Sequence, residues 1–357
     1  MNNKTKILSV EAIDLLKQLI QIPSFSKEEW ETASVLTKLL FDKNILVTRA
    51  GNNVIARNKF FDEHKPTILL NSHHDTVKPN PGYTRNPFEA VVEDGKLFGL
   101  GSNDAGGCLV SLMATFLYFF DEEHLKYNLV FAATAEEEIS GSNGIEMALQ
   151  HLPKIDSAIV GEPTEMQMAV AERGLIVLDC VAKGKAGHAA RNEGDNALYN
   201  ALADIEWIRN FRFEKTSELL GEVKMCVTSI ETENKAHNVV PDSCRFVVDV
   251  RVNEMYSLEE VVSTIQANLK CNVQPRSLRM KSSGIAMDHP LVKSGLSLGR
   301  KVYGSPTTSD KALMPFPALK MGPGNSARSH TADEFIYVDE IESGIVLYIK
   351  LLEQLLR

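Results

Sequence analysis

Three consecutive carboxylates follow an apolar run in the sequence NLVFAATAEEEIS. The run at 129–134 has the composition of a buried strand, and Glu136, Glu137 and Glu138 come directly after it. Like charges at the end of a strand repel one another unless they reach water, bind cations or take up protons. A solvated loop would also explain the triplet, so the choice depends on which other side chains gather at the same place.

Histidine and aspartate follow a second buried strand. TILLN, at residues 67–71, is followed by Ser72-His73-His74-Asp75. His73 therefore stands just past the carboxyl end of a strand, where ligands collect in open α/β sheets. In an extended segment residues i and i+2 share a face, so Asp75 can accept the ring N–H of His73 while the other ring nitrogen binds a metal.

Three more candidates stand at the ends of predicted elements. Asp104 precedes a buried helix in LGSNDAGG, Glu162 follows the strand at 157–160, and His330 lies in the C-terminal loop ARSHTADEF. Each residue taken alone is also compatible with a helix cap or a solvated side chain. Together with His73 and the acidic triplet, however, they are expected at one edge of one sheet.

Two histidines and three carboxylates are a suitable donor set for two Zn²⁺-like ions. Each ion would take one histidine and one terminal carboxylate, and a shared aspartate would bridge them. Glu138 is then a ligand, Glu137 points elsewhere and acts as general base, and Glu136 is outward and solvated. Zinc is the expected metal, and Co²⁺ or Mn²⁺ fits the same geometry.

The hydrophobic pattern predicts the elements that position these residues. Helices at 10–21, 27–42 and 108–120 alternate with strands at 44–49, 53–57, 67–72 and 128–134, which indicates an α/β sheet. From about Leu175 the strands become one-sided, in a β-α-β-β-α order. We therefore expect a discontinuous catalytic domain at 1–174 and 283–357, with an inserted α+β domain at 175–282.

Composition narrows the class of partner. The 357 residues carry a net charge of −9 and no basic stripe with interleaved aromatics, which argues against nucleic acid. The longest apolar stretch, at 108–120, is shorter than the roughly 20 residues of a membrane span. The N-terminal pattern predicts an amphipathic helix and lacks the apolar core of a signal peptide. We expect the five scattered cysteines to be buried free thiols. We expect a cytoplasmic protein with a small-molecule partner and no membrane contact.

Seven motifs in this order carry a family resemblance: SHHDTV, GLGSNDAGG, TAEEEISGSNG, GEPT, GKAGHAA, NVVPDSCRFVVDVR and SHTADEF. The chain resembles, over nearly its whole length, the co-catalytic zinc peptidases and deacylases. That family includes acetylornithine deacetylase, succinyl-diaminopimelate desuccinylase and carboxypeptidase G. The resemblance implies a zinc-exopeptidase-like, mixed-sheet catalytic domain and an inserted lid domain that also forms a homodimer.

The resemblance also implies roles for single residues in the catalytic domain. One metal would be held by His73, Asp104 and Glu162. The other would be held by Asp104, Glu138 and His330. Glu137 matches the general base of the family, and Asp75 matches the residue that supports His73.

In the lid domain, His188 of GKAGHAA matches the histidine that stabilises the oxyanion, either within one chain or across the dimer. Asn238 and Arg251 match positions that bind the polar groups and the carboxylate of the substrate. The residues alone leave His188 open as a loop residue and Arg251 open as a structural ion pair.

The function implied is metal-assisted hydrolysis of an N-acyl amino acid, of the acetylornithine or acetylcitrulline class in arginine or lysine biosynthesis. Succinylated substrates are an open alternative, for which Lys311 and Arg191 are candidate partners. A dipeptidase or carboxypeptidase of the same fold is a second alternative. A non-catalytic protein that binds acyl amino acids is a third, and it predicts the loss of a ligand or of the base.

Overall fold

The computed structural model describes residues 2–191 and 193–357, and the chain divides into two compact units. Unit 1 comprises Met1–Val170, Gly284–Tyr303 and Ser309–Arg357. Unit 2 comprises Ala171–Ser283 and Gly304–Thr308. The role of unit 2 as a lid and dimerisation domain stays a prediction.

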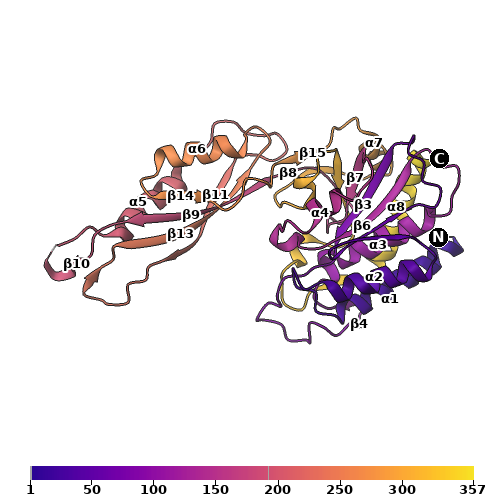
Figure 1. The fold of residues 1–357 in the computed structure, drawn as a ribbon, viewed down its shortest axis with the longest axis horizontal. Helices are drawn as coiled ribbons and strands as arrows, with labels where there is room; N and C mark the ends of the chain where they lie inside the picture. Colours follow the sequence, from indigo (N-terminus) through magenta and orange to yellow (C-terminus); the bar gives the residue numbers. More distant parts are fainter. Residues whose placement is uncertain (1, 192) are drawn as a thin grey trace. The chain divides into compact units, whose positions relative to one another are not determined.

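A mixed sheet forms the centre of unit 1, as the sequence predicted (Figure 1). Its strand order is β1-β2-β6-β3-β7-β17-β8-β15, with β16 paired to β8. The middle pairs β6/β3, β3/β7 and β7/β17 are parallel, whereas β1/β2 and β2/β6 are antiparallel. The bounds are β1 Val47–Ala50, β2 Asn53–Arg57, β3 Thr67–His73, β6 Asn128–Thr134, β7 Ser157–Val160, β8 Met168–Glu172, β15 Ser283–Gly284, β16 Val302–Ser305 and β17 Ala318–Lys320.

Helices cover this sheet. Every residue of α3 (Gly107–Phe119) except Leu117 is buried, because α3 packs against β3 and β6 and is covered by α1 and α8. A helix that is apolar all round needs such an enclosed position. The other helices of unit 1 are α1 Asn3–Ile20, α2 Trp30–Asp42, α4 Ile145–Leu149, α7 Pro290–Ser297 and α8 Val338–Leu356. A small separate sheet joins β4 Val91–Glu93, β5 Lys96–Phe98 and β18 Phe335–Tyr337.

Unit 2 is an antiparallel sheet with one buried face. Its order is β11-β13-β9-β14, and β9 alternates between buried and half-buried residues. The helices α5 (Ala197–Asn210) and α6 (Leu258–Asn268) share one hydrophobic core with the buried residues of β9 and β13 (Figure 1). The strands are β9 Gly174–Lys183, β11 Lys224–Glu231, β13 Ser243–Val252 and β14 Asn272–Pro275, with a two-stranded sheet of β10 Gly187–His188 and β12 Val239–Val240.

Two expectations about composition can be compared with the structure. Cys108, Cys180 and Cys244 are buried, but Cys226 is exposed, so the prediction that all five thiols are buried was wrong. Cys226 lies on β11, an edge strand of a sheet with only one covered face. Among the described residues, no helix combines the length and apolarity that crossing a bilayer requires.

Candidate metal centre

Parallel pairing brings the candidate residues to one edge of the sheet. His73 ends β3 and lies opposite Thr134, the last residue of β6. The acidic turn at 136–138 follows β6, and Glu162 follows β7 on the other side of β3. Because the carboxyl ends of adjacent parallel strands meet, residues 73, 138 and 162 converge although they are far apart in sequence.

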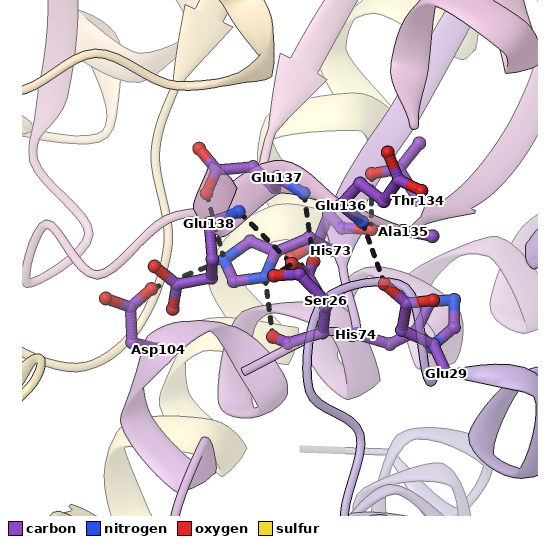
Figure 2. Close-up of polar contacts among 12 residues, drawn as sticks. Ser26, Glu29, His73, His74, Asp104, Thr134, Ala135, Glu136, Glu137 and Glu138 are labelled. Carbon is purple, nitrogen blue, oxygen red and sulfur yellow. Dashed lines mark hydrogen bonds and ion pairs between the residues drawn. The ribbon is translucent and has the colours of Figure 1, made fainter. Parts of the chain in front are cut away.

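His73 faces three carboxylates. Its Nε2 lies 3.3 Å from Asp104 Oδ1, 3.8 Å from Glu162 Oε1 and 4.0 Å from Glu137 Oε2. Figure 2 shows Glu137 and Glu138 reaching this histidine from the same short turn. The prediction that Glu137 points elsewhere was therefore wrong, because its carboxylate enters the same cluster as that of Glu138.

Asp104 stands between the two histidines. Its Oδ1 is the oxygen near His73, whereas its Oδ2 lies 3.6 Å from His330 Nε2. His330 also contacts Glu138, with 2.9 Å between Nε2 and Oε2. One aspartate with each oxygen turned to a different histidine has the arrangement of a bridging ligand.

These separations fit metal ligands. Two donors bonded to one tetrahedral ion at about 2.0–2.1 Å lie roughly 3.3 Å apart. The distances from Asp104 to His73 and to His330, 3.3 and 3.6 Å, are close to that value. Ligand atoms of two sets lie within 4.8 Å of one another: His73, Asp104 and Glu138, and His73, Glu137 and Glu162.

The raised pKa values of the clustered carboxyl groups also favour bound cations. Burial raises the pKa of Glu162 to about 8. Burial also raises the pKa of Glu137 well above its usual range, and the charge of Glu162 raises it further. Acids in such a place need either protons or cations. Two divalent cations would supply the missing positive charge and restore the carboxylate form.

Asp75 holds both the histidine and the acidic turn. His73 Nδ1 lies 3.0 Å from the Asp75 carbonyl oxygen and 3.4 Å from its Oδ1, which leaves Nε2 for a metal. The sequence predicted the carboxylate as the partner, but the backbone carbonyl is nearer. The carboxylate also accepts the backbone N–H groups of Glu137 and Glu138, both at 3.1 Å.

The position of the Glu136 side chain differs most clearly from the expectation. The sequence predicted a solvated side chain, but it is 5% exposed. Its carboxylate accepts the side-chain amide of Asn143 at 2.9 Å and the backbone N–H of Asn143 at 3.3 Å. The chain folds back after the triplet, so Glu136 fixes the following loop instead of reaching water.

Two further residues, His74 and Glu334, support the cluster. His74 is buried, with Nδ1 2.9 Å from Thr32 Oγ1 and Nε2 3.0 Å from the Asn52 carbonyl, and burial lowers its pKa to about 4. Glu334 accepts the backbone N–H groups of Gly101, Asn103 and Asp104. No sequence pattern singles out Glu334, because an acid four residues after a histidine in a polar loop is typical of a surface position.

In unit 2, His188 and Asn238 lie together. The pair β10/β12 sets His188 opposite Val239, and the Ala189 N–H donates to the Asn238 carbonyl at 3.0 Å. His188 Nδ1 accepts the Ala190 N–H at 3.1 Å, so a neutral ring carries its proton on Nε2. Both His188 and Asn238 are exposed.

Arg251 lies apart from that pair. Its Nε and Nη2 donate to the two carboxylate oxygens of Asp249 at 2.7 and 2.9 Å, so the ion pair left open by the sequence is present. In the register of β13 with β9, Arg251 lies opposite Leu175 and Ser243 lies opposite Lys183, at opposite ends of the two strands. At about 3.3 Å per residue these ends are roughly 26 Å apart, and β10 lies beyond the Ser243 end (Figure 1).

Known proteins resemble this chain in sequence and fold. Succinyl-diaminopimelate desuccinylase of Rickettsia bellii is 26% identical over 281 residues, which cover 74% of this chain and 72% of that protein. An M20-family metallo-carboxypeptidase of Sulfolobus solfataricus has a TM-score of 0.76 at 18% identity, with 99% of each chain covered. A dinuclear metal-binding peptidase of Bacillus subtilis has a TM-score of 0.71 at 16% identity, covering 97% of this chain and 98% of that one.

The fold and the gathered acids and histidines agree with a match to a family model over residues 69–354. That span includes every candidate ligand, the acidic turn and the whole of unit 2. The chain belongs to peptidase family M20/M25/M40 and is a metal-dependent hydrolase.

Proposed function

We propose that this protein is a dinuclear metal-dependent amide hydrolase that removes the acyl group from an N-acyl amino acid. The observation that supports it most strongly is Asp104, whose two oxygens face His73 and His330 separately. In this proposal His73, Asp104 and Glu162 hold one ion, and Asp104, Glu138 and His330 hold the other. Zinc is the expected metal because nitrogen and carboxylate donors suit it.

Each residue near the ions would have its own role in the hydrolysis. When bound, the metal pair polarises the acyl carbonyl and acidifies the attacking water. Glu137 takes a proton from that water and returns it to the leaving amine. Asp75 holds the backbone of Glu137, and the Nε2–H of His188 donates to the oxygen that becomes negative.

The separation within unit 2 supports a homodimeric site. His188 and Arg251 of one chain lie at opposite ends of a ladder roughly 26 Å long. One small acyl amino acid cannot touch both. In this proposal Arg251 exchanges Asp249 for the substrate carboxylate, and the oxyanion is stabilised by His188 of the partner subunit.

The acyl group is the least constrained part of this proposal. The sequence motifs favoured acetylated ornithine or citrulline, whereas the Rickettsia bellii relative is a desuccinylase. Lys311, offered by the sequence as a partner for a succinyl group, is 1% exposed, and its ammonium group donates to the Ala169 carbonyl at 3.3 Å. Arg191 is exposed and remains the candidate for that role.

Two alternatives follow from the comparisons and the site. Fold similarity to a carboxypeptidase favours peptide hydrolysis as the second candidate. A binding protein without activity is less well supported, because all five candidate ligands and Glu137 are gathered at one sheet edge.

The test is the rate of amine release by the metal-loaded protein from a matched panel. The panel holds acetyl- and succinyl-ornithine, acetyl- and succinyl-citrulline, succinyl-diaminopimelate and a dipeptide, with Glu137→Gln as the inactive control. We expect one acyl amino acid to be preferred by at least about tenfold. Cleavage of the dipeptide alone would replace the proposal with the peptidase alternative, and no turnover of any compound would contradict hydrolysis.

A further inference from the structure

The segment Ser24–Glu29, between α1 and α2, packs beside the acidic turn. Its start is tied to the strand end that carries the metal candidates, because the Thr76 N–H donates to the Ser24 carbonyl at 2.8 Å. Phe25 and Thr76 form an isolated parallel bridge. The segment therefore reaches the site as a bridge followed by a turn at residues 26 and 27, and not as part of a helix.

Glu29 is the most buried acid of this segment, with 0% exposure. Its Oε1 accepts the backbone N–H of Lys27 at 2.6 Å and that of Glu136 at 3.2 Å. Its Oε2 accepts the side-chain amide of Asn52 at 2.8 Å. One carboxylate thus joins its own segment, the loop between β1 and β2, and the first residue of the acidic triplet.

Ser26 acts on the same turn through Asp75. Its Oγ donates to Asp75 Oδ2 at 2.7 Å, and that oxygen also accepts the N–H of Glu138. Asp75 Oδ1 accepts the N–H of Glu137. Ser26 is half-buried, and its hydroxyl fixes the rotation of the carboxylate that holds both residues.

Three successive backbone N–H groups, those of residues 136, 137 and 138, therefore donate to two buried carboxylates (Figure 2). Hydrogen bonds to ionised acceptors are stronger than neutral ones. Glu136 also has a φ of 53°, a left-handed conformation that is unfavourable for a residue other than glycine. The turn consequently depends on partners outside itself to keep this conformation.

We infer that Glu29 and Ser26 are positioning residues for the reaction, because they set the backbone from which Glu137 and Glu138 reach the metals. This inference rests on the proposed function. Neither residue touches the reacting atoms in this scheme. Their effect would pass through the main chain, and side chains placed to within a fraction of an ångström are what such catalysis requires.

The local sequence argues for a different role that the structure does not show. Ser26-x-x-Glu29 before an apolar run matches the pattern of a helix capping box. In the structure α2 begins at Trp30, and the Glu29 side chain makes no cap hydrogen bond. Glu29 bonds the acidic turn directly and Ser26 bonds Asp75, which holds that turn, so their removal is expected to affect the site more than the helix.

The first experiment is hydrogen exchange, which does not depend on turnover. We expect Glu29→Ala to speed exchange of the amide protons at 136–138 by about tenfold or more, while the other strand-end amides of the sheet stay protected. Glu29→Gln, which keeps an oxygen for Glu136, should stay close to the wild type. Glu28→Ala removes an exposed neighbouring acid and is the matched control. Unchanged exchange at 136–138 would overturn the inference.

The second experiment measures kcat, KM and metal content on the preferred substrate. Glu29→Ala should lower kcat by about 10- to 100-fold while KM stays within about threefold and two metals stay bound. Ser26→Ala should lower kcat by a smaller factor, and Ser26→Thr should restore it. A loss that merely follows the folded or metal-loaded fraction would show a structural role only.

The two readouts separate this inference from the proposed function. If the wild type hydrolyses no member of the panel, the proposed function fails, and the exchange result alone decides whether Glu29 holds the turn. If Glu29→Ala does not fold, Ser26→Ala carries the same test, because it removes one hydroxyl from a half-buried position and should speed exchange at Glu137 and Glu138.

Discussion

The sheet edge of unit 1 and the loops of unit 2 hold their candidate residues in different ways. In unit 1 three of the five candidate ligands lie at or after the ends of buried strands, and backbone N–H groups bonded to Asp75, Glu29 and Glu334 fix the acidic turn and the segment of Asp104. In unit 2 His188, in a two-stranded sheet, and Asn238, just before its second strand, are exposed, and Arg251 is paired with Asp249. The candidate metal ligands are thus organised within one chain, whereas the residues of unit 2 proposed to contact the substrate are either exposed or paired with another side chain.

The largest effect should come from the organised region. Glu137→Gln keeps the size of the side chain but removes the base, so kcat should fall by a factor on the order of 1,000. The folded structure and the two bound metals should remain, because Asp75 contacts only the backbone N–H of Glu137. Steady-state kinetics and metal analysis check this, and a loss below about tenfold would contradict the role of base.

The second-largest loss of activity should come from a change in unit 2. His188→Ala should lower kcat by about 100-fold, the usual range for one oxyanion donor, without changing stability or metal content, since His188 is exposed.

A mixed dimer tests which chain supplies that histidine. Glu137→Gln and His188→Ala protomers, each strongly impaired alone, are unfolded, mixed and refolded together. If His188 acts across the dimer, one site of the mixed dimer has both groups and activity returns. A mixture as inactive as the two variants would place Glu137 and His188 of one active site in the same chain.

A smaller effect distinguishes a buried histidine of unit 1 from the exposed His188. Burial lowers the pKa of His74 from 6.5 to about 4. As pH falls below about 6.5 the unfolded chain takes up this proton and the folded one does not, so stability is lost, on the order of 2 kcal/mol by pH 5. A cation at His73 would lower the pKa of His74 further, so the sign holds with or without metal.

Denaturant unfolding at pH 7 and pH 5 checks this prediction. His74→Gln is the control, because it offers an N–H to the Asn52 carbonyl but does not titrate. The wild type should lose more stability than this variant over the same interval. Equal losses would show that His74 does not titrate in this way.

The same contrast explains what the sequence could predict. The strands predicted at 67–72 and 128–134 and the helix predicted at 108–120 agree with β3, β6 and α3 to within one residue at each end, because their apolar runs are continuous. The positions of three candidate ligands at strand ends followed from the predicted strands. The burial of Glu136 and the contacts of Glu29 were not predictable. Glu136 is buried because its carboxylate bonds Asn143, and Glu29 accepts the N–H of Glu136, which is 107 positions away in the sequence. No local sequence pattern indicates these hydrogen bonds. The contact between Arg251 and Asp249 could have been predicted from the sequence, since residues i and i+2 of a strand share a face.

The place where unit 2 joins the chain has an evolutionary consequence. The chain leaves unit 1 after Val170 on β8 and returns at Gly284 on β15, the neighbouring strand, with the Ile285 N–H bonded to the Val170 carbonyl at 2.8 Å. An insertion whose two ends are neighbours can be lengthened, exchanged or lost without breaking the sheet that carries the metals. Under the roles proposed for His188 and Arg251, substrate preference can therefore diversify by variation in this segment, while the candidate metal ligands of unit 1 are inherited intact.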